Sequence, residues 1–288
     1  MIPFLQACAN GLLTGSLYAL IGMGLALIFG VMRIVNFAHG AFLMVGMYAT
    51  FVFFEYFKIN PYIGFLPAGI FLFIFGYIVY LLLIRPVRNQ SHFMQILMTS
   101  GIALILIDSA QLIFHADYRQ TRIELINRYV HFGPFTLNAA SLLSFGIAVV
   151  FIVGLTLFVT KSLTGQALRA IAQNPDVAPL MGINVSRIQG LSFALGLAYA
   201  GLAGGLLLPA LYLFPSVGED YTTKAFVIVV LGGMGSIEGA ALGGLVLGVA
   251  ESLTSLYIGN QWALAVDFVL FLLVLSLKPS GIFGRQRA

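Results

Sequence analysis

The charged residues of this chain lie far apart, and the uncharged stretches between them limit its fold more than any other feature. No Asp, Glu, Lys or Arg occurs in residues 1–32, 34–54, 59–84, 89–107, 129–160 or 188–218. A helix needs about 20 apolar residues to cross the hydrocarbon core of a bilayer. A transmembrane β-barrel would instead show alternating segments of about ten residues. The runs therefore predict an all-α protein, a polytopic bundle of transmembrane helices embedded in the lipid bilayer.

The composition excludes several other classes. Hydrophobic residues make up 60% of the chain and charged residues 8%, whereas a soluble domain carries roughly 25% charged residues. A soluble enzyme and a disordered chain are both excluded. Cys8 is the single cysteine, so we expect no disulfide framework and no Cys-based metal site. We also expect no cofactor. The net charge of +4 comes from basic residues between the runs and indicates membrane topology, not a nucleic-acid partner.

We expect one transmembrane domain over residues 1–288 with about eight or nine spans. Six spans are predicted at 10–31, 36–55, 62–84, 94–114, 139–160 and 188–209. In the last third, a short or broken helix near 225–235 is followed by helices near 239–257 and 262–277. At least one span is therefore predicted to be broken or re-entrant.

The basic residues predict the orientation of the spans. We place nine of them in the cytoplasm: Arg33, Arg85, Arg88, Lys161, Arg169, Arg187, Lys278, Arg285 and Arg287. Five remain outside: Lys58, Arg119, Arg122, Arg128 and Lys224. This division follows the excess of Lys and Arg in cytoplasmic loops. It places the N-terminus and the loop with Glu219 and Asp220 outside.

Two glycine-bounded segments interrupt the apolar pattern. Residues 232–236 read Gly-Gly-Met-Gly-Ser, and three glycines in four residues destabilise a continuous helix. A break at membrane depth is tolerated where it lines a cavity or is buried in protein. The segment Gly30–Gly40 contains Arg33, Asn36 and His39. It is either a short cytoplasmic connection or an irregular segment that enters the bundle, and the residues leave both interpretations open.

The longest polar stretch is the loop 161–187. Its composition predicts a helix over Gln166–Gln173 that stops at Asn174 and Pro175. Asp176 is expected to cap a second short helix that ends at Met181, with Gly182 as its stop and Pro179 in its first turn. These helices would present Leu168, Ala172, Leu180 and Met181. Such apolar residues suit the groove of a partner protein; an amphipathic helix on the membrane surface is the alternative.

Motifs for enzymatic chemistry are missing from the sequence. It has no G-x-x-x-x-G-K-[ST], H-E-x-x-H or G-x-S-x-G, so we predict no nucleotide site and no catalytic residues. Asp108, Glu251 and Asp267 are the acidic residues expected within spans, and their roles stay open. They do not form a chain of acids and histidines, which disfavours an ion-coupled secondary carrier.

Three segments resemble a known family. Gly30–Gly40 with the following Leu43–Tyr48, the loop Gly165–Ile183 and the segment Val227–Ser236 are similar to the permease subunits of ATP-binding-cassette importers for branched-chain and other hydrophobic amino acids. The shorter of the family's two permeases is the better match. The resemblance implies a multi-pass protein of the bacterial inner membrane. It also implies a heterodimer with a second permease, two ATPase subunits that hydrolyse ATP, and a periplasmic or extracellular substrate-binding protein. Urea and short-amide permeases are close relatives, which leaves the substrate open.

The resemblance places the coupling segment in the loop 165–183, and the two predicted helix breaks indicate the substrate pathway. The coupling contact with the ATPases is expected at Leu168, Arg169, Gln173, Asn174, Pro175, Asp176, Leu180, Met181 and Gly182. The substrate pathway is expected at Asn36, Phe37, His39, Gly40, Gly232, Gly233, Gly235 and Ser236. Broken helix ends there would offer partial charges to the zwitterionic head of an amino acid.

Overall fold

The structure is a computed structural model that describes residues 1–121, 123–278 and 281–282. Within these residues, eight helices are long and apolar enough to cross a membrane. The first five begin the chain as α1 (Ile2–Met32), α2 (His39–Phe57), α3 (Pro61–Val79) with its continuation α4 (Arg85–Val87), α5 (His92–Phe114) and α6 (Ala139–Lys161). The remaining three are α8 (Val185–Leu207), α10 (Ile237–Tyr257) and α11 (Ala263–Leu277). Two shorter helices complete the set, namely α7 (Leu163–Gln173) and α9 (Val217–Gly232).

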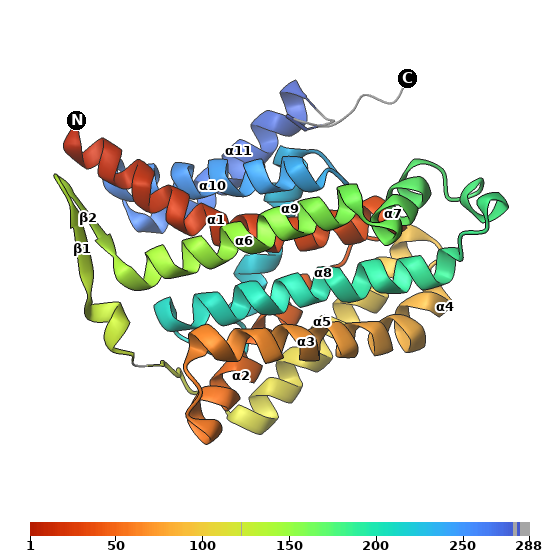
Figure 1. The fold of residues 1–288 in the computed structure, drawn as a ribbon, viewed down its shortest axis with the longest axis horizontal. Helices are drawn as coiled ribbons and strands as arrows, with labels where there is room; N and C mark the ends of the chain where they lie inside the picture. The colour runs from red at the N-terminus through yellow and green to blue at the C-terminus, as the bar shows by residue number, and fades with distance from the viewer. Residues whose placement is uncertain (122, 279–280, 283–288) are drawn as a thin grey trace.

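The long helices run in a broadly common direction, and two small elements mark the ends of the bundle (Figure 1). A hairpin of β1 (Tyr129–Phe132) and β2 (Phe135–Asn138) lies at one end, which we call the hairpin end. α7 lies at the opposite end, the α7 end. The N-terminus is at the hairpin end, so α1 runs towards the α7 end.

Glycines hold α1 and α10 together in the centre of the bundle. A Cβ atom built on Gly11 would lie 2.6 Å from Val249 Cα, and one on Gly15 would lie 2.9 Å from the carbonyl oxygen of Gly244. Small residues allow such close approach of two backbones. The glycines of these two helices therefore serve close helix packing.

α3 continues into α4 through one wider turn. Residues Tyr80–Ile84 form a π-helical turn directly before Arg85 and Pro86. A proline has no amide hydrogen, and its ring collides with the carbonyl group four residues earlier in a regular α-helix. The wider turn gives the ring room, so the span continues from Pro61 to Val87.

The predicted spans are confirmed, with three differences in detail. α1 begins at Ile2, not residue 10, and α9 begins at Val217, not residue 225. Glu219, Asp220 and Lys224 were predicted to lie outside the spans, but all three lie within α9, and Lys224 is largely buried, so that assignment is wrong. The hairpin was not predicted because its strands begin an uncharged run. Arg122, Arg285 and Arg287 lie outside the described residues.

Candidate functional site

The segment after α1 turns back into the bundle. Arg33 leaves the helix in a left-handed conformation, with φ 56°. The Nε2 atom of His39, the first residue of α2, lies 3.0 Å from the carbonyl oxygen of Ile21. Ile21 precedes Met32 by 11 residues, which is about 16 Å along a helix. α2 therefore begins well inside the bundle, about a third of the length of α1 from its C-terminal end. The irregular segment that enters the bundle is the correct interpretation.

Asn36 organises the start of α2. Its side chain is fully buried, and its Oδ1 atom accepts a hydrogen bond from the backbone N–H of Ala38 at 3.1 Å. Among the described residues, Asn36 Nδ2 and His39 Nδ1 have no hydrogen-bond partner. Phe37 points elsewhere: it is 38% exposed and packs on Phe226 of α9, with 5.1 Å between the ring centroids. The segment thus offers buried polar groups beside an exposed aromatic ring.

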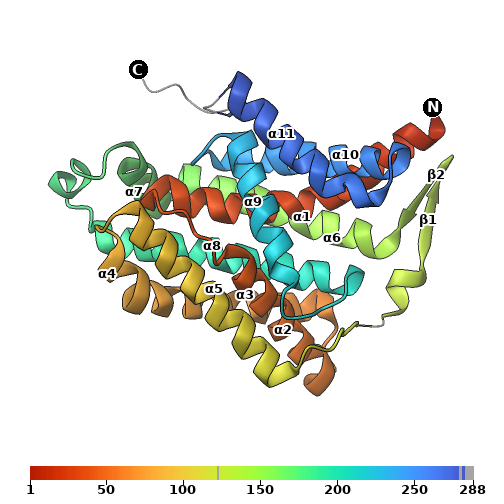
Figure 2. The same cartoon turned by 180° about the vertical axis from the view of Figure 1, so that it is seen from behind.

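The first turn of α9 packs against the first turn of α2. The backbone N–H of Gly40 donates a hydrogen bond to Thr222 Oγ1 at 3.0 Å. A Cβ atom on Gly40 would overlap the carbonyl oxygen of Gly218, and one on Gly218 would lie 3.0 Å from the amide nitrogen of Ala41. Figure 2 shows α9 crossing steeply to the direction of α1. Two helix N-termini, each with a partial positive charge, therefore meet inside the bundle.

The contact between α2 and α9 gives a first testable prediction. We expect Gly40→Ala to lower the free energy of unfolding by about 1–3 kcal/mol, because the added methyl group meets backbone atoms that cannot move aside. Thermal unfolding of the purified protein in detergent measures the change. Gly101→Ala in α5 is the matched control, since a Cβ there meets no atom within 4 Å. Equal unfolding temperatures for the two variants would contradict the close contact.

The second predicted break lies elsewhere. α9 ends at Gly232 and α10 begins at Ile237, so residues 233–236 form a turn between two helices. Gly233 and Gly235 have φ of 99° and 87°, which favours glycine. Ser236 caps α10 by accepting a hydrogen bond from the N–H of Gly239 at 3.0 Å.

This turn is close to the end of α1, because a Cβ atom on Gly30 would lie 3.1 Å from the carbonyl oxygen of Gly235. The two predicted groups of pathway residues therefore lie at opposite ends of α9. Asn36, Phe37, His39 and Gly40 gather at its beginning. Gly232, Gly233, Gly235 and Ser236 form its far end, near the α7 end of the bundle.

α7 is amphipathic and rests on the bundle by its apolar side. Ser162 caps it by accepting a hydrogen bond from the N–H of Gly165 at 2.9 Å. Leu168 and Ile171 are each 1% exposed and belong to the hydrophobic core. The prediction that Leu168 is presented to a partner is therefore wrong, because it lies on the inward side of the helix. Arg169 lies on the outer side and donates a hydrogen bond to the carbonyl oxygen of Thr160 at 3.2 Å.

The turn after α7 is capped by a residue other than the predicted one. Asn174 Oδ1 accepts hydrogen bonds from the N–H groups of Asp176 and Val177, at 3.0 and 3.3 Å. Asp176 is exposed and does not cap the helical turn Ala178–Met181, so that prediction is wrong. The predicted stop is confirmed, because Gly182 adopts φ 77°.

The loop presents a small exposed apolar surface. Leu180 and Met181 are 82% and 79% exposed, as predicted. Leu163 at 83% and Val177 at 49% were not predicted. Ala172 and Pro175 are half-buried, whereas Gln173, Asn174 and Gly182 are exposed. Val177, Leu180 and Met181 belong to the turn that projects from the bundle beyond α7 (Figure 1), whereas Leu163 is the first residue of α7.

Sequence reasoning missed a buried ionic cluster. Lys224 of α9 forms an ion pair with Glu251 of α10, and its Nζ atom lies 3.6 Å from Asp267 Oδ2 of α11. Tyr18 of α1 donates a hydrogen bond to Glu251 at 2.7 Å, and its ring lies beneath Nζ with 4.8 Å to the centroid. Asp267 is fully buried and is the one buried residue of α11. Two acids and one lysine in a nearly uncharged third of the chain were the available signal.

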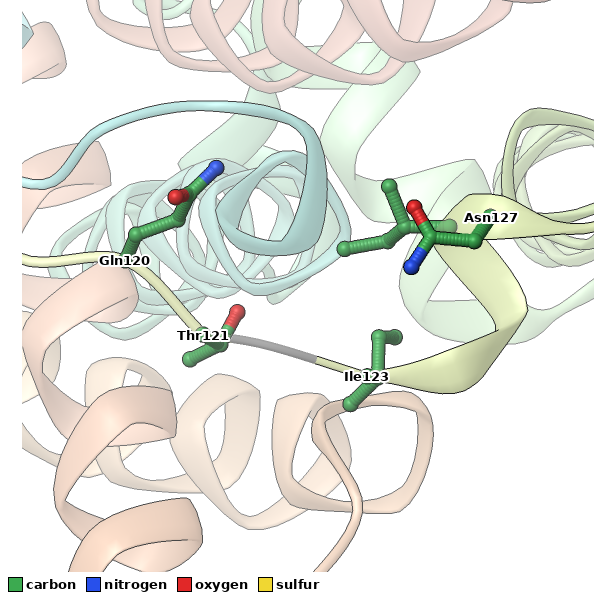
Figure 3. A pocket seen from close by; sticks show the side chains of 5 residues that line it. Gln120, Thr121, Ile123 and Asn127 are labelled. Carbon is green, nitrogen blue, oxygen red and sulfur yellow. The ribbon is translucent and has the colours of Figure 1, made fainter.

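A pocket of about 240 Å³ lies apart from these groups. It is lined by loop residues between α5 and the hairpin, namely Gln120, Thr121, Ile123, Ile126 and Asn127 (Figure 3). No charged side chain is among these lining residues. None of the predicted pathway residues lines it.

Comparison with known proteins identifies the family. The family described as branched-chain amino acid transport system / permease component matches residues 7–275. The chain is 36% identical to the high-affinity branched-chain amino acid transport system permease protein LivH of Salmonella typhimurium, over 98% of this chain and 96% of that protein. It is 30% identical over 139 residues to the probable branched-chain amino acid transport permease protein LivM of Methanocaldococcus jannaschii, covering 42% and 40% of the two chains.

A solved structure shares the architecture. The structure titled PsaBC from Streptococcus pneumoniae in complex with Fab has a TM-score of 0.52 at 12% identity, covering 96% of this chain and 93% of that one. At this identity the likeness concerns the fold alone. The family match and the match to LivH, in contrast, extend over nearly the whole chain. The chain therefore belongs to the family of branched-chain amino acid transport system permease components.

Proposed function

We propose that this protein is a permease subunit of an ATP-binding-cassette importer that moves branched-chain or other hydrophobic amino acids into the cytoplasm. The observation that carries this proposal is the exposed turn Val177–Gly182, which projects from the bundle beside α7. A permease without a nucleotide motif must receive energy from separate ATPase subunits, and an exposed apolar turn held on a buried helix suits that contact. A second permease and a substrate-binding protein complete the proposed assembly.

The basic residues support one orientation in the membrane. Among the described residues, seven adjoin the helix ends and loops at the α7 end: Arg33 after α1, Arg85 and Arg88 at α4, Lys161 at the end of α6, Arg169 in α7, Arg187 in the first turn of α8 and Lys278 after α11. Three lie in the connections towards the hairpin end: Lys58 after α2, Arg119 after α5 and Arg128 directly before β1. The excess of Lys and Arg favours the α7 end in the cytoplasm of a bacterial inner membrane. The hairpin end then faces the substrate-binding protein.

Cysteine labelling tests this orientation. In a Cys8→Ser background, Gln173→Cys should react only with reagents that reach the cytoplasm, and Tyr129→Cys in the hairpin should react from outside. Both positions are exposed, so the labelling reports access to a compartment. If Gln173→Cys reacted from outside and Tyr129→Cys only with reagents that reach the cytoplasm, the orientation would be reversed. The proposed contact with the ATPase subunits would then be ruled out.

We place the substrate pathway beside the first turns of α2 and α9. An amino acid carries a carboxylate, and helix N-termini inside transporters stabilise such a group by their partial positive charge. Asn36 and His39 add polar atoms without partners among the described residues, and Phe37 and Gly40 border the same place. The turn with Gly232, Gly233, Gly235 and Ser236 would lie further along the pathway, towards the cytoplasm.

Asn36 offers a direct test of the pathway. Asn36→Leu removes both its donor and its acceptor, whereas Asn36→Asp retains the oxygen that accepts the hydrogen bond from the N–H of Ala38. We expect both to raise the substrate concentration for half-maximal uptake about tenfold or more, because a hydrogen bond to a charged group contributes about 1.5–3 kcal/mol. Uptake into intact cells or proteoliposomes measures this. Normal uptake by Asn36→Asp would show that Asn36 stabilises the turn before α2 and does not bind the substrate.

The assembly and the substrate class are tested separately. ATPase subunits should co-purify with this chain, and uptake should require ATP while resisting ionophores that collapse ion gradients. Uptake without ATP that stops with an ionophore would instead support the ion-coupled alternative. Competition by leucine but not by urea or acetamide would support the amino-acid substrate over the amide alternative.

A further inference from the structure

Three exposed carboxylates lie at a depth where lipid would surround an isolated chain. Gly218 of α9 contacts Gly40 of α2, and α2 begins about 16 Å from the C-terminal end of α1, which is about half the thickness of a bilayer's hydrocarbon core. Glu219 and Asp220 follow Gly218 directly and are exposed. Both therefore lie near the middle of the bundle and far from its two ends.

Asp108 of α5 lies at a similar depth. The ring of Phe114, at the end of α5, stacks on Tyr48 of α2 with 4.3 Å between centroids. Tyr48 follows His39 by nine residues, about 14 Å along α2, and Asp108 precedes Phe114 by six residues, about 9 Å along α5. Asp108 is exposed and lies within about 5 Å of the level of His39, if the two helices cross the membrane with similar tilt.

The three carboxylates are on one face of the molecule. Figure 2 shows α5 and α9 on the same side, with α9 between α5 and α11. Within the described residues, none of the three has an ion-pair partner. Leu104 and Leu112 flank Asp108 by one helical turn on either side and are 61% and 81% exposed. An ionised side chain at this depth is strongly unfavourable against lipid, so this face requires another cover.

The opposite face of the bundle, on α6, needs no protein partner to shield charged side chains from lipid. On α6, the exposed residues at helical spacing are Leu143, Gly146, Val150, Gly154 and Leu157. A Cβ atom on Gly146 or Gly154 would meet no atom within 4 Å. This small and apolar stripe is compatible with lipid as it stands, and it contains no charge that must be shielded.

We infer that the face formed by Asp108, Leu104 and Leu112 of α5 with Glu219 and Asp220 of α9, which we call the acidic face, is covered by the second permease subunit. This inference rests on the proposed function. The leucines contact the partner, and the carboxylates border a hydrated space between the two subunits. Because the acidic face carries three negative charges, the partner surface that closes this space is polar or basic, and not continuously apolar.

Spin labels on single cysteines test the inference. In a Cys8→Ser background, labels are placed at Leu104→Cys and Asp220→Cys, with Val150→Cys on α6 as the matched control. The chain is co-expressed with its second permease and reconstituted in lipid, and a sample without the second permease serves as reference. Collision with oxygen reports lipid, and collision with a water-soluble nickel complex reports water.

We expect the second permease to lower the oxygen collision rate at position 104 several-fold and to leave position 150 unchanged. The label at position 220 should collide with the nickel complex in the assembled pair. Shielding at 150 with full oxygen access at 104 would overturn the inference, as would a failure of the two permeases to associate. Leu112→Cys replaces Leu104→Cys if the latter does not fold.

This measurement needs neither transport nor ATPase subunits. If the label at position 104 is shielded but no ATPase binds the pair, the result supports the acidic face as the contact with the second permease and contradicts the proposed importer. If ATPases bind but position 150 is shielded in place of 104, the result supports the proposed importer and contradicts the acidic face as the contact with the second permease.

Discussion

Lys224→Met is expected to lower the stability of this protein more than Gly40→Ala does. The lysine is the cation of a buried cluster in which Glu251 and Asp267 are the anions. Its removal leaves two carboxylates within the bundle without a counter-charge. Breaking a buried ion pair costs about 3–5 kcal/mol, so most of the protein should be lost as aggregate. Size-exclusion chromatography in mild detergent, together with the unfolding temperature, measures the loss.

Charge-neutral combinations separate this explanation from a loss of packing. Asp267→Asn should be tolerated far better than Lys224→Met, because the Lys224–Glu251 pair remains. The triple variant Lys224→Met, Glu251→Gln, Asp267→Asn should recover much of the lost stability, since no net charge remains buried. A triple variant as unstable as Lys224→Met alone would show that the lysine acts through its shape and not its charge.

The second large effect is expected on transport. Leu180→Glu and Met181→Glu should each lower uptake at least tenfold, because a charge enters the apolar contact that we propose for the ATPase subunits. Insertion and protein level should stay normal, since both side chains are about four-fifths exposed. Uptake and substrate-stimulated ATP hydrolysis in proteoliposomes are the measurements.

Leu163→Glu is the matched control for the coupling variants. Leu163 is exposed to 83%, but it lies at the opposite end of α7. Normal coupling in Leu163→Glu with loss in Leu180→Glu assigns the docking contact to the projecting turn. Equal damage from both, with weaker membrane association of the loop, would instead favour the amphipathic surface helix.

The long uncharged runs made most of the spans predictable. Lipid excludes charge along a whole helix, so the positions of Arg33, Arg85 and Lys161 mark helix ends directly. Lys224 violated this rule because Glu251 and Asp267, distant in sequence, neutralise it within the bundle. α9 consequently began eight residues earlier than predicted. Pairing between distant residues leaves no periodic signal in a single sequence.

The candidate site was predictable in part for the same reason. Asn36 and His39 were visible as polar residues in an apolar stretch, but only the contact with Ile21 shows that α2 begins inside the bundle. Leu168 and Leu180 are both leucines in the polar loop 161–187, but Leu168 is buried and Leu180 is exposed. Leu168 lies on the side of α7 that rests on the bundle, whereas Leu180 lies in the turn Ala178–Met181 that projects beyond α7, and the loop sequence alone does not encode this difference.

The ionic cluster also has a consequence for the order in which the protein is made. Synthesis proceeds from the N-terminus, so α9 and α10 enter the membrane before α11 exists, and Lys224 and Glu251 can neutralise each other first. Asp267 then arrives on a helix that is otherwise apolar, with no buried residue besides Asp267 itself. α11 can therefore insert into lipid as a separate helix and then associate with the other helices of the bundle. Lys224 is already in place there to pair with Asp267. Assembly of the last helix thus becomes a late step that reports whether the preceding helices have folded.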